Sequence, residues 1–307
     1  MKVTGITPRG YCKGVVRAIN IAKKATQDVT KQPLYILGMI VHNEYIVNAL
    51  KEMGAITIED AHKTRLELLD EIDHGTVIIT AHGAGDVVSQ KAREKGLDVI
   101  DASCLDVIKT HDLIKEELAK GYEILYIGKK NHPEAEGAML IDPEHMHLIA
   151  KKEDFDGLDP EKHYMLTNQT TMSLYDVYDL TEYAKAHLPH LAVEQEICTA
   201  TKIRQEAIAK MDEDIDLVII VGDPHSNNTK KLASISHDQA HKEVKMIGSI
   251  EELDIAWLMD KHHVAVSSGA STPTSLTNQI IDFIAQFDPA DQTTYEKPAV
   301  DYSRILR

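Results

Sequence analysis

The chain holds three cysteines, Cys12, Cys104 and Cys198, at nearly equal intervals along its 307 residues. Each lies in a short segment of the kind that binds ligands, and these segments cover residues 8–14, 101–106 and 196–201. Three thiolates from three parts of a chain would make a metal or iron–sulfur site with one coordination position left open. Because a substrate can occupy that position, the pattern predicts chemistry at a metal centre.

A simpler interpretation is that the thiols only fill apolar cores, since free cysteine is among the most often buried residue types. Their regular spacing and loop contexts argue against it. A disulfide framework is also disfavoured, because the count is odd and residues 1–6 open as a strand rather than as a signal peptide. We therefore expect reduced thiols in a cytoplasmic protein.

Size and charge narrow the possible functions. A chain of 307 residues exceeds the usual single core, so two or three modules are expected, and 43% apolar residues suffice to build them. No stretch has the roughly 20 continuous apolar residues of a membrane span. The net charge of −16 disfavours nucleic acid and anionic membranes as partners. An anionic ligand would need neutral donors, imidazoles and helix N-termini.

Short apolar runs alternate with helical patterns along the chain. Buried parallel strands are predicted at residues 77–80, 124–127, 217–221 and 264–266, and helices at 106–120, 174–188, 204–211, 230–239 and 275–287. This alternation is typical of an α/β fold. Residues 151–162 are predicted to form a surface loop, and residues 288–307 to wrap the outside or to be partly mobile.

Polar loops follow the predicted strands. They contain His82, the run from His132 to Glu134, the run from Ser226 to Asn228, and Ser271. In open α/β sheets ligands bind beyond the carboxyl ends of the strands, so the loops should share one face. Small polar residues that lead into a helix also favour phosphate, because backbone N–H groups and the helix dipole attract anions.

Most of the 16 histidines must be incidental. Three have small or turn-forming neighbours at predicted strand ends and could charge near neutral pH to bind an anion, namely His42, His82 and His132. Eight lie in polar or helical stretches and are predicted to be solvated, namely His62, His74, His145, His147, His187, His190, His237 and His241.

Taken together in order, these motifs resemble those of the 4-hydroxy-3-methylbut-2-enyl diphosphate reductases, the IspH or LytB family, over about residues 1–285. The motifs that carry the resemblance are Pro8 to Cys12, Val41 to Asn43, Ala81 to Gly83, Asp101 to Asp106, His132 to Gly137, Asn168 to Thr171, Ile197 to Ala207, Ser226 to Asn228 and Gly269 to Pro273. Each alone is weak, but their joint order is specific.

The resemblance implies three similar α/β lobes in a pseudo-threefold trefoil around a central iron–sulfur cavity. The lobes would be residues 13–103, 104–195, and 196–285 together with 1–12, followed by a C-terminal tail at 286–307. One [4Fe–4S] cluster per chain would be held by Cys12, Cys104 and Cys198. A flavodoxin or ferredoxin is the implied electron donor.

The resemblance also implies a reductive dehydroxylation to isopentenyl and dimethylallyl diphosphate, the last step of the methylerythritol phosphate route to isoprenoids. The substrate hydroxyl would bind the iron that lacks a cysteine, two electrons would enter through the cluster, and water would leave. Glu134 is the implied proton source, with His132 and Thr170 nearby, although by position alone it would be an exposed turn residue. The implied substrate-binding residues are His42, His82, His132, Thr170, Ser226, Asn227, Asn228 and Ser271.

Two departures from the family pattern stand out. Many members have proline where this chain has Leu105, a change that frees a backbone φ angle and could loosen the Cys104 loop. Some have Ser-Ser-Asn where this chain has Ser226, Asn227 and Asn228. Two other functions stay open, a three-cysteine zinc hydrolase of a phosphorylated substrate and a non-catalytic iron–sulfur redox sensor.

Overall fold

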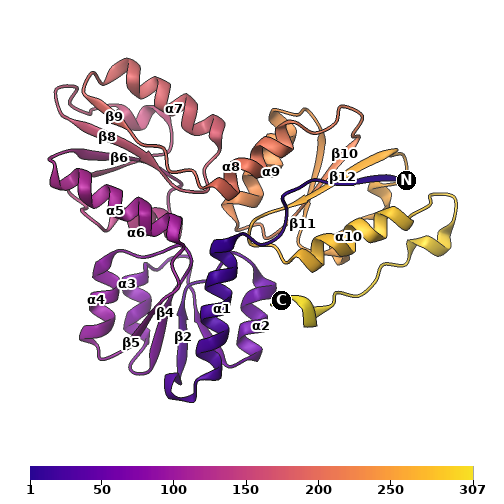
Figure 1. Ribbon diagram of the computed structural model, residues 1–307, viewed down its shortest axis with the longest axis horizontal. Helices are drawn as coiled ribbons and strands as arrows, with labels where there is room; N and C mark the ends of the chain where they lie inside the picture. The colour runs from indigo at the N-terminus through magenta and orange to yellow at the C-terminus, as the bar shows by residue number, and fades with distance from the viewer. Residues whose placement is uncertain (307) are drawn as a thin grey trace. The chain divides into compact units, whose positions relative to one another are not determined.

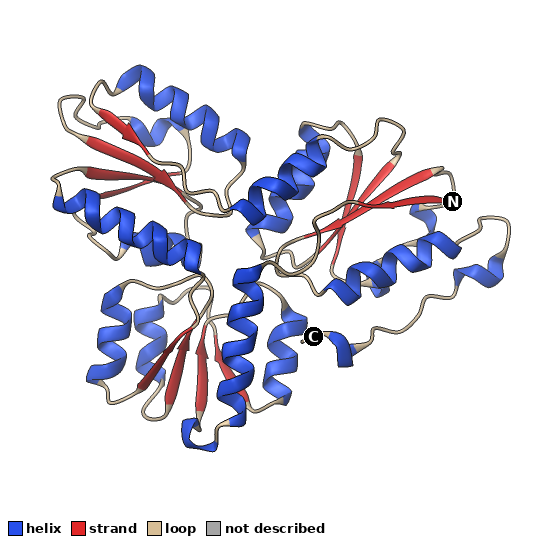
Figure 2. Ribbon diagram, in the orientation of Figure 1, coloured by secondary structure: helices blue, strands red, loops and turns tan. Residues whose placement is uncertain are grey.

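Residues 1–306, which the computed structural model describes, fold into three separate four-stranded sheets with helices around them (Figure 2). In the first sheet the order is β3 (Ala55–Ile58), β2 (Leu34–Leu37), β4 (Thr76–Ile79), β5 (Asp98–Asp101). In the second it is β7 (Met146–Ile149), β6 (Glu123–Ile127), β8 (Tyr164–Asn168), β9 (Leu191–Val193). In the terminal sheet it is β1 (Lys2–Gly5), β12 (His263–Ser268), β10 (Leu217–Val221), β11 (Glu243–Ile247).

Every strand pair in these sheets is parallel, which confirms the predicted α/β class and the buried parallel strands. The helices are α1 (Lys13–Gln27), α2 (Glu44–Glu52), α3 (Arg65–Leu68), α4 (Asp86–Glu94), α5 (Leu105–Ala119), α6 (Pro133–Met139), α7 (Leu174–His187), α8 (Thr199–Ala209), α9 (Asn227–Asp238) and α10 (Thr274–Gln286). All five predicted helices form. The one over 204–211 begins earlier than predicted, at Thr199, directly after Cys198.

Each sheet is covered by helices whose apolar faces build its core (Figure 1). The second sheet has α7 on one face, with Val177 in its core, and α5 and α6 on the other, with Ile114 and Ala135. In the terminal sheet, Ile208 of α8 and Leu232 of α9 pack in one core. Strands buried on both faces need continuous apolar runs, and β10 is such a strand, since all five of its residues are buried.

By packing, the chain divides into two compact units. Unit 1 holds Met1–Lys13, His42–Ala49 and the residues from Thr199 on, and therefore contains the terminal sheet. Unit 2 holds Gly14–Val41 and Leu50–Cys198, and therefore contains the first and second sheets. The lobe boundaries drawn from the sequence remain a prediction.

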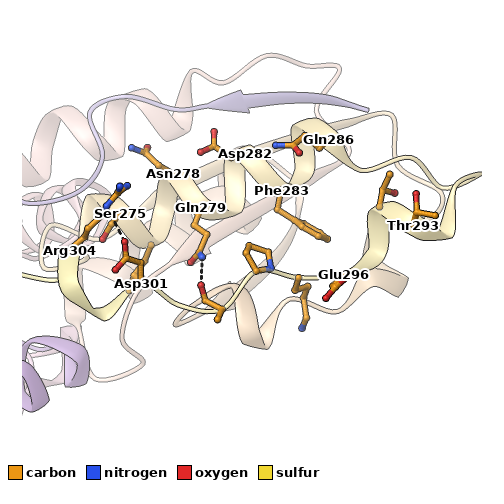
Figure 3. A pocket seen from close by; sticks show the side chains of 15 residues that line it. Ser275, Asn278, Gln279, Asp282, Phe283, Gln286, Thr293, Glu296, Asp301 and Arg304 are labelled. Carbon is orange, nitrogen blue, oxygen red and sulfur yellow. Dashed lines mark hydrogen bonds and ion pairs between the residues drawn. The ribbon is translucent and has the colours of Figure 1, made fainter.

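The C-terminal segment, residues 288–306, lies along α10 in unit 1. Gln279 of α10 donates to the Ala299 carbonyl at 2.6 Å, and Lys297 donates to the carbonyls of Glu251 and Leu253. A cleft of about 890 Å³ lies between this segment and α10, and Asn278, Asp282 and Glu296 are among its lining residues (Figure 3). Close to its end the segment is anchored by Ile305, which is fully buried.

Gly10, two residues before Cys12, has a backbone conformation and surroundings that only glycine accepts without strain. Gly10 has φ +75°, and a Cβ there would collide with Oγ1 of Thr274 at the start of α10. Gly96 has a similar φ of +77° with nothing within 4 Å of a Cβ, so it is a matched control. A left-handed backbone conformation costs an L residue about 1–2 kcal/mol, so both alanine variants should lose about that much free energy of unfolding.

Gly10→Ala should therefore lower the thermal unfolding midpoint of the metal-free protein by more than Gly96→Ala does, because only the former adds a steric clash. Differential scanning calorimetry of both variants beside the wild type measures this. Equal shifts for the two variants would show that the close approach to Thr274 does not constrain the Cys12 loop.

Candidate functional site

Among the acids in the strand-end loops of unit 2, Glu134 has the most strongly shifted pKa. It lies in the first turn of α6 and is only 2% exposed. One carboxylate oxygen accepts the backbone N–H of Thr170 at 2.7 Å, and the Thr170 hydroxyl adds a side-chain hydrogen bond. Position alone indicated an exposed turn residue, and the structure shows instead that the carboxyl group is dry.

Burial raises the pKa of Glu134 from 4.5 to about 7. The hydrogen bonds from Thr170 act in the opposite direction because they favour the carboxylate, whereas the charge of Asp106 raises the pKa further. Burial, and then the charge of Glu134, also raises the pKa of Tyr126 in the neighbouring β6 well above its ordinary value. A carboxyl group with a pKa near neutrality is suited to hold and deliver a proton.

His132 is fixed in one role by its backbone neighbours. It is 5% exposed and caps α6, because its Nδ1 accepts the backbone N–H of Glu134 at 3.1 Å. An accepting Nδ1 carries no proton, so the ring is assigned as the Nε2–H tautomer and offers one neutral donor. A cationic His132, as predicted from the sequence, would lose this cap because its Nδ1 would carry a proton and could not accept. His82 lies edge-on to it, with ring centroids 5.6 Å apart, and its Nδ1 is 3.3 Å from the Thr80 hydroxyl.

Two cysteines of unit 2 each come directly before a helix. Cys104 is the N-cap residue of α5, and its N–H donates to the Ala81 carbonyl at 2.9 Å. Cys198 precedes α8, and its N–H donates to the Thr170 carbonyl at 3.1 Å. Neither cysteine forms a disulfide, and both are partly exposed. The backbone of Thr170 thus contacts both Glu134 and the Cys198 backbone.

Cys12 in unit 1 has the same local arrangement. It is a partly exposed thiol outside any disulfide, directly before α1, and its N–H donates to the Ala270 carbonyl at 3.1 Å. The preceding Gly10 donates its N–H to the Ser268 hydroxyl at 2.8 Å. The loop before Cys12 is therefore fixed on the carboxyl end of β12.

The predicted anion-binding residues of unit 1 lie at the starts of two helices. Ser226 caps α9 by accepting the Thr229 N–H at 3.3 Å, which leaves its own O–H free to donate. The next residues, Asn227 and Asn228, are both 4% exposed. Within residues 1–306, neither amide atom of Asn228 has a hydrogen-bond partner, although both are buried. Such a group is costly to leave unsatisfied, so it fits a ligand-binding role.

His42 and Ser271 are brought together in the same unit. The Ser271 hydroxyl donates to the His42 carbonyl at 2.9 Å, so its proton must turn away from that carbonyl before it can reach an anion. Asp223, after β10, accepts the Glu44 N–H at 3.1 Å and so holds the start of α2 beside the same strand ends. The three candidate segments of unit 1 are thus held together by side-chain to backbone bonds.

Sequence reasoning missed the arginines that hold these loops. Arg204 is 3% exposed and donates to the carbonyls of Gly10 and Ala200, both at 2.8 Å. Arg17 donates to the Ser103 carbonyl at 2.7 Å, next to Cys104. No local pattern marks such contacts, because an arginine that serves a distant carbonyl looks like any surface cation in sequence.

Seven of the eight histidines predicted to be solvated are exposed, and the prediction for His147 is wrong. His147 is half-buried in β7, and its Nε2 lies 2.8 Å from a Glu123 carboxylate oxygen on β6. Because β6 and β7 are neighbours, the two side chains meet across the sheet.

The cysteines fit an iron–sulfur cofactor by their chemistry. All three are partly exposed thiols outside any disulfide, and each precedes a helix whose N-terminal N–H groups favour negative charge. Thiolate donors of this kind are the usual ligands of iron–sulfur clusters. Within residues 1–306, no three His, Cys, Asp or Glu side chains form a group that could hold a metal ion. The structure places Cys104 and Cys198 in unit 2 and Cys12 in unit 1.

Comparisons with known proteins agree with the motifs. The family model described as LytB protein matches residues 3–285. A protein of Geobacillus sp. (strain WCH70) is 52% identical over 299 residues, covering 97% of this chain and 94% of its own length. One of Anoxybacillus flavithermus (strain DSM 21510 / WK1) is 50% identical over 309 residues, covering 100% and 98%. Both relatives are named 4-hydroxy-3-methylbut-2-enyl diphosphate reductase.

Two solved structures are similar as well. The E-1-hydroxy-2-methyl-but-2-enyl-4-diphosphate reductase of Plasmodium falciparum superposes with a TM-score of 0.86 at 32% identity, covering 94% of this chain and 88% of that one. A (E)-4-hydroxy-3-methyl-but-2-enyl diphosphate reductase, described as the terminal enzyme of the non-mevalonate pathway, gives 0.65 at 29% identity, covering 94% and 100%.

The fold and the site define an α/β protein of three parallel sheets whose strand-end loops carry thiols, imidazoles and the buried carboxyl group of Glu134. The chain belongs to the LytB protein family. None of the helices formed by residues 1–306 has the length and apolar character needed to cross a membrane.

The dry carboxyl group should make stability depend on pH. Because the folded protein holds the Glu134 proton more tightly than the unfolded chain does, the free energy of unfolding should fall as pH rises from about 4.5 to about 7. The fall should be about 3 kcal/mol, since each unit of pKa shift corresponds to about 1.4 kcal/mol. Glu134→Gln should lack this fall. Urea unfolding of both proteins across that range measures it, and a constant difference between them would contradict the shifted pKa.

Leu105 should tolerate the family's proline. It is the first residue of α5, a position that proline favours, and it is 64% exposed. The adjoining loop is held without proline by the hydrogen bonds from Cys104 to Ala81 and from Arg17 to Ser103, so leucine at this position does not have to loosen the loop.

Leu105→Pro should therefore leave the fold intact and raise the free energy of unfolding by about 0.4–1 kcal/mol, because proline restricts the unfolded chain. Chemical unfolding of the variant beside wild type tests this. A drop in stability would mean that the Leu105 backbone has a role that its position at the helix start does not reveal.

Proposed function

We propose that this protein is an oxidoreductase that converts 4-hydroxy-3-methylbut-2-enyl diphosphate to isopentenyl and dimethylallyl diphosphate, the last step of the methylerythritol phosphate pathway. Relatives with about half of their residues identical over nearly the full chain carry the name of this reductase. The observation that carries the proposal is Glu134, a dry carboxyl group with a pKa of about 7 beside predicted diphosphate-binding histidines.

The reaction replaces a hydroxyl group by hydrogen, so it consumes two electrons and two protons and releases one water. We infer that Glu134 holds a proton for this step, because its pKa of about 7 keeps a large share of it protonated near neutral pH. The N–H and hydroxyl of Thr170 orient its carboxyl group. When the group gives up its proton, the same two donors stabilise the carboxylate that remains.

We infer one [4Fe–4S] cluster per chain, with Cys12, Cys104 and Cys198 as its ligands. The support is the donor set, three partly exposed thiols that each precede a helix. When bound, such a cluster supplies the electrons and a Lewis-acidic iron at its open position.

We infer that the diphosphate is bound by His42, His82, His132, Thr170, Ser226, Asn227, Asn228 and Ser271. In a protein of net charge −16, these groups attract an anion by donating hydrogen bonds rather than by formal charge. The Nε2–H of His132, the free O–H of Ser226 and the unpaired amide of Asn228 are donors of this kind. The starts of α9 and α10 add backbone N–H groups.

The remaining assignments follow from the same function. We propose a small iron–sulfur or flavin carrier, a ferredoxin or flavodoxin, as electron donor, and the cytoplasm as the compartment, since the three cysteines form no disulfide. The zinc hydrolase and the redox sensor are not supported, because the relatives carry the name of the reductase.

The deciding experiment is oxidation of a reduced viologen dye by anaerobically purified protein, with and without 4-hydroxy-3-methylbut-2-enyl diphosphate. Glu134→Gln should lower the substrate-dependent rate by about 10²–10⁴-fold, the usual contribution of a general acid, at unchanged iron and sulfide content. Glu144→Gln, an exposed glutamate after the same helix, is the control and should turn over normally. Full activity of Glu134→Gln would remove this residue from the mechanism. A wild type with a full cluster and no substrate-dependent rate would refute the reductase.

A further inference from the structure

Arg65 and Glu136 form an ion pair that is largely removed from water inside unit 2. The guanidinium Nη1 lies 2.8 Å from one carboxylate oxygen of Glu136, and the Arg65 backbone N–H donates to the other at 2.8 Å. The two side chains are only 7% and 21% exposed. Arg65 is the first residue of α3 and Glu136 lies in α6, so the pair joins a helix of the first sheet to the helix that carries Glu134.

The guanidinium of Arg65 is also confined on its Nη2 side. A Cβ at Gly38 would lie 2.9 Å from Nη2, so the loop after β2 passes close to the guanidinium and leaves it little room to move. Thr64 caps α3 in a capping box with Glu67, which fixes the Arg65 backbone N–H that donates to Glu136. Both donors to Glu136 are therefore rigid, and they determine where its carboxylate can lie.

Next to this pair, α6 packs against the loop that follows His82 without intervening side chains. A Cβ at Gly137 would lie 3.1 Å from Cα of Ala84, and one at Gly85 would lie 2.7 Å from the Leu140 Cβ. The backbones of helix and loop are thus in contact, and a small shift of α6 along the loop would change how His82 and His132 face each other.

We infer that Arg65 and Glu136 are positioning residues for the proposed reduction: their pair fixes α6 in register with the His82 loop, so that Glu134 and His132 act on one substrate. The inference rests on the proposed function. Neither residue needs to touch the substrate, since both act through the helix. A displacement of about 1 Å at reacting groups can lower a rate about 10²-fold, so a loosened α6 should show mainly in kcat.

The test replaces the pair by apolar side chains in the double variant Arg65→Met with Glu136→Leu. A single Arg65→Met leaves a carboxylate without its cation in a largely buried site and risks unfolding, whereas a buried ion pair replaced by apolar groups often keeps its stability. The double variant should fold with a full cluster and a moderately lowered thermal midpoint, because the Arg65 backbone N–H loses its acceptor. Its kcat in the viologen assay should fall at least tenfold with a smaller change in KM, and its ratio of isopentenyl to dimethylallyl diphosphate should differ from wild type.

Lys31→Met is the matched control, because it removes an ion pair with Asp98 that is 3.0 Å long but exposed, in the same unit. It should leave kcat, KM and product ratio unchanged. A folded double variant with the kcat and product ratio of wild type would overturn the inference, because the pair would then serve stability alone.

A second readout does not depend on turnover, so it separates this inference from a failure of the proposed function. Nitrogen chemical shifts of the His132 ring, assigned with a His132→Asn variant, report whether Nδ1 accepts the Glu134 N–H. Wild type and Lys31→Met should show a single accepting Nδ1, and the double variant should show a mixture of tautomers. An unchanged His132 signal in the double variant would refute the positioning role whether or not any of the proteins turns over.

Discussion

The backbone of Thr170 is the constraint on which unit 2 depends. Its N–H donates to Glu134 at 2.7 Å and its carbonyl accepts the Cys198 N–H at 3.1 Å, so the two peptide groups that flank one residue set the places of an acid and a thiol. Its neighbours extend this role, since Gln169 accepts the Lys129 N–H in the loop before His132 and Asn168 accepts the Glu196 N–H before Cys198. The segment that follows β8 therefore positions both the acid, Glu134, and the thiol, Cys198.

Charge explains why this protein needs such fixed groups. With a net charge of −16 its general field repels a diphosphate, so binding energy must come from short, directed hydrogen bonds. Directed bonds are strong only if their donors are held in place, because each donor that must be ordered on binding costs conformational entropy. His132 meets this requirement, since its bond to the Glu134 N–H fixes both ring orientation and tautomer. The same bond ties a proposed anion-binding donor to the acid.

The sequence predicted the parts of this protein that follow from local pattern. The apolar run at residues 217–221 is a strand with those bounds, because a strand buried on both faces is continuous in sequence. The start of α8 was missed, since Thr199 to Ile203 shows no helical periodicity of its own. The dryness of Glu134 was missed for a different reason. The backbone of Thr170, which covers one carboxylate oxygen of Glu134, is 36 residues away in the sequence, and no local pattern encodes that contact.

Burial of Glu134 lowers the stability of the fold but suits the group to proton transfer. The buried carboxylate lacks the hydration that it would have in the unfolded chain, which costs folding free energy at neutral pH and at the same time raises the pKa to about 7. The hydrogen bonds from Thr170 lower that cost without removing it, so the group still holds its proton near neutrality. A rigid segment is needed to keep a group in such an unfavourable place, because a mobile one would turn the carboxylate towards water. The close packing of Gly137 on Ala84 supplies that rigidity.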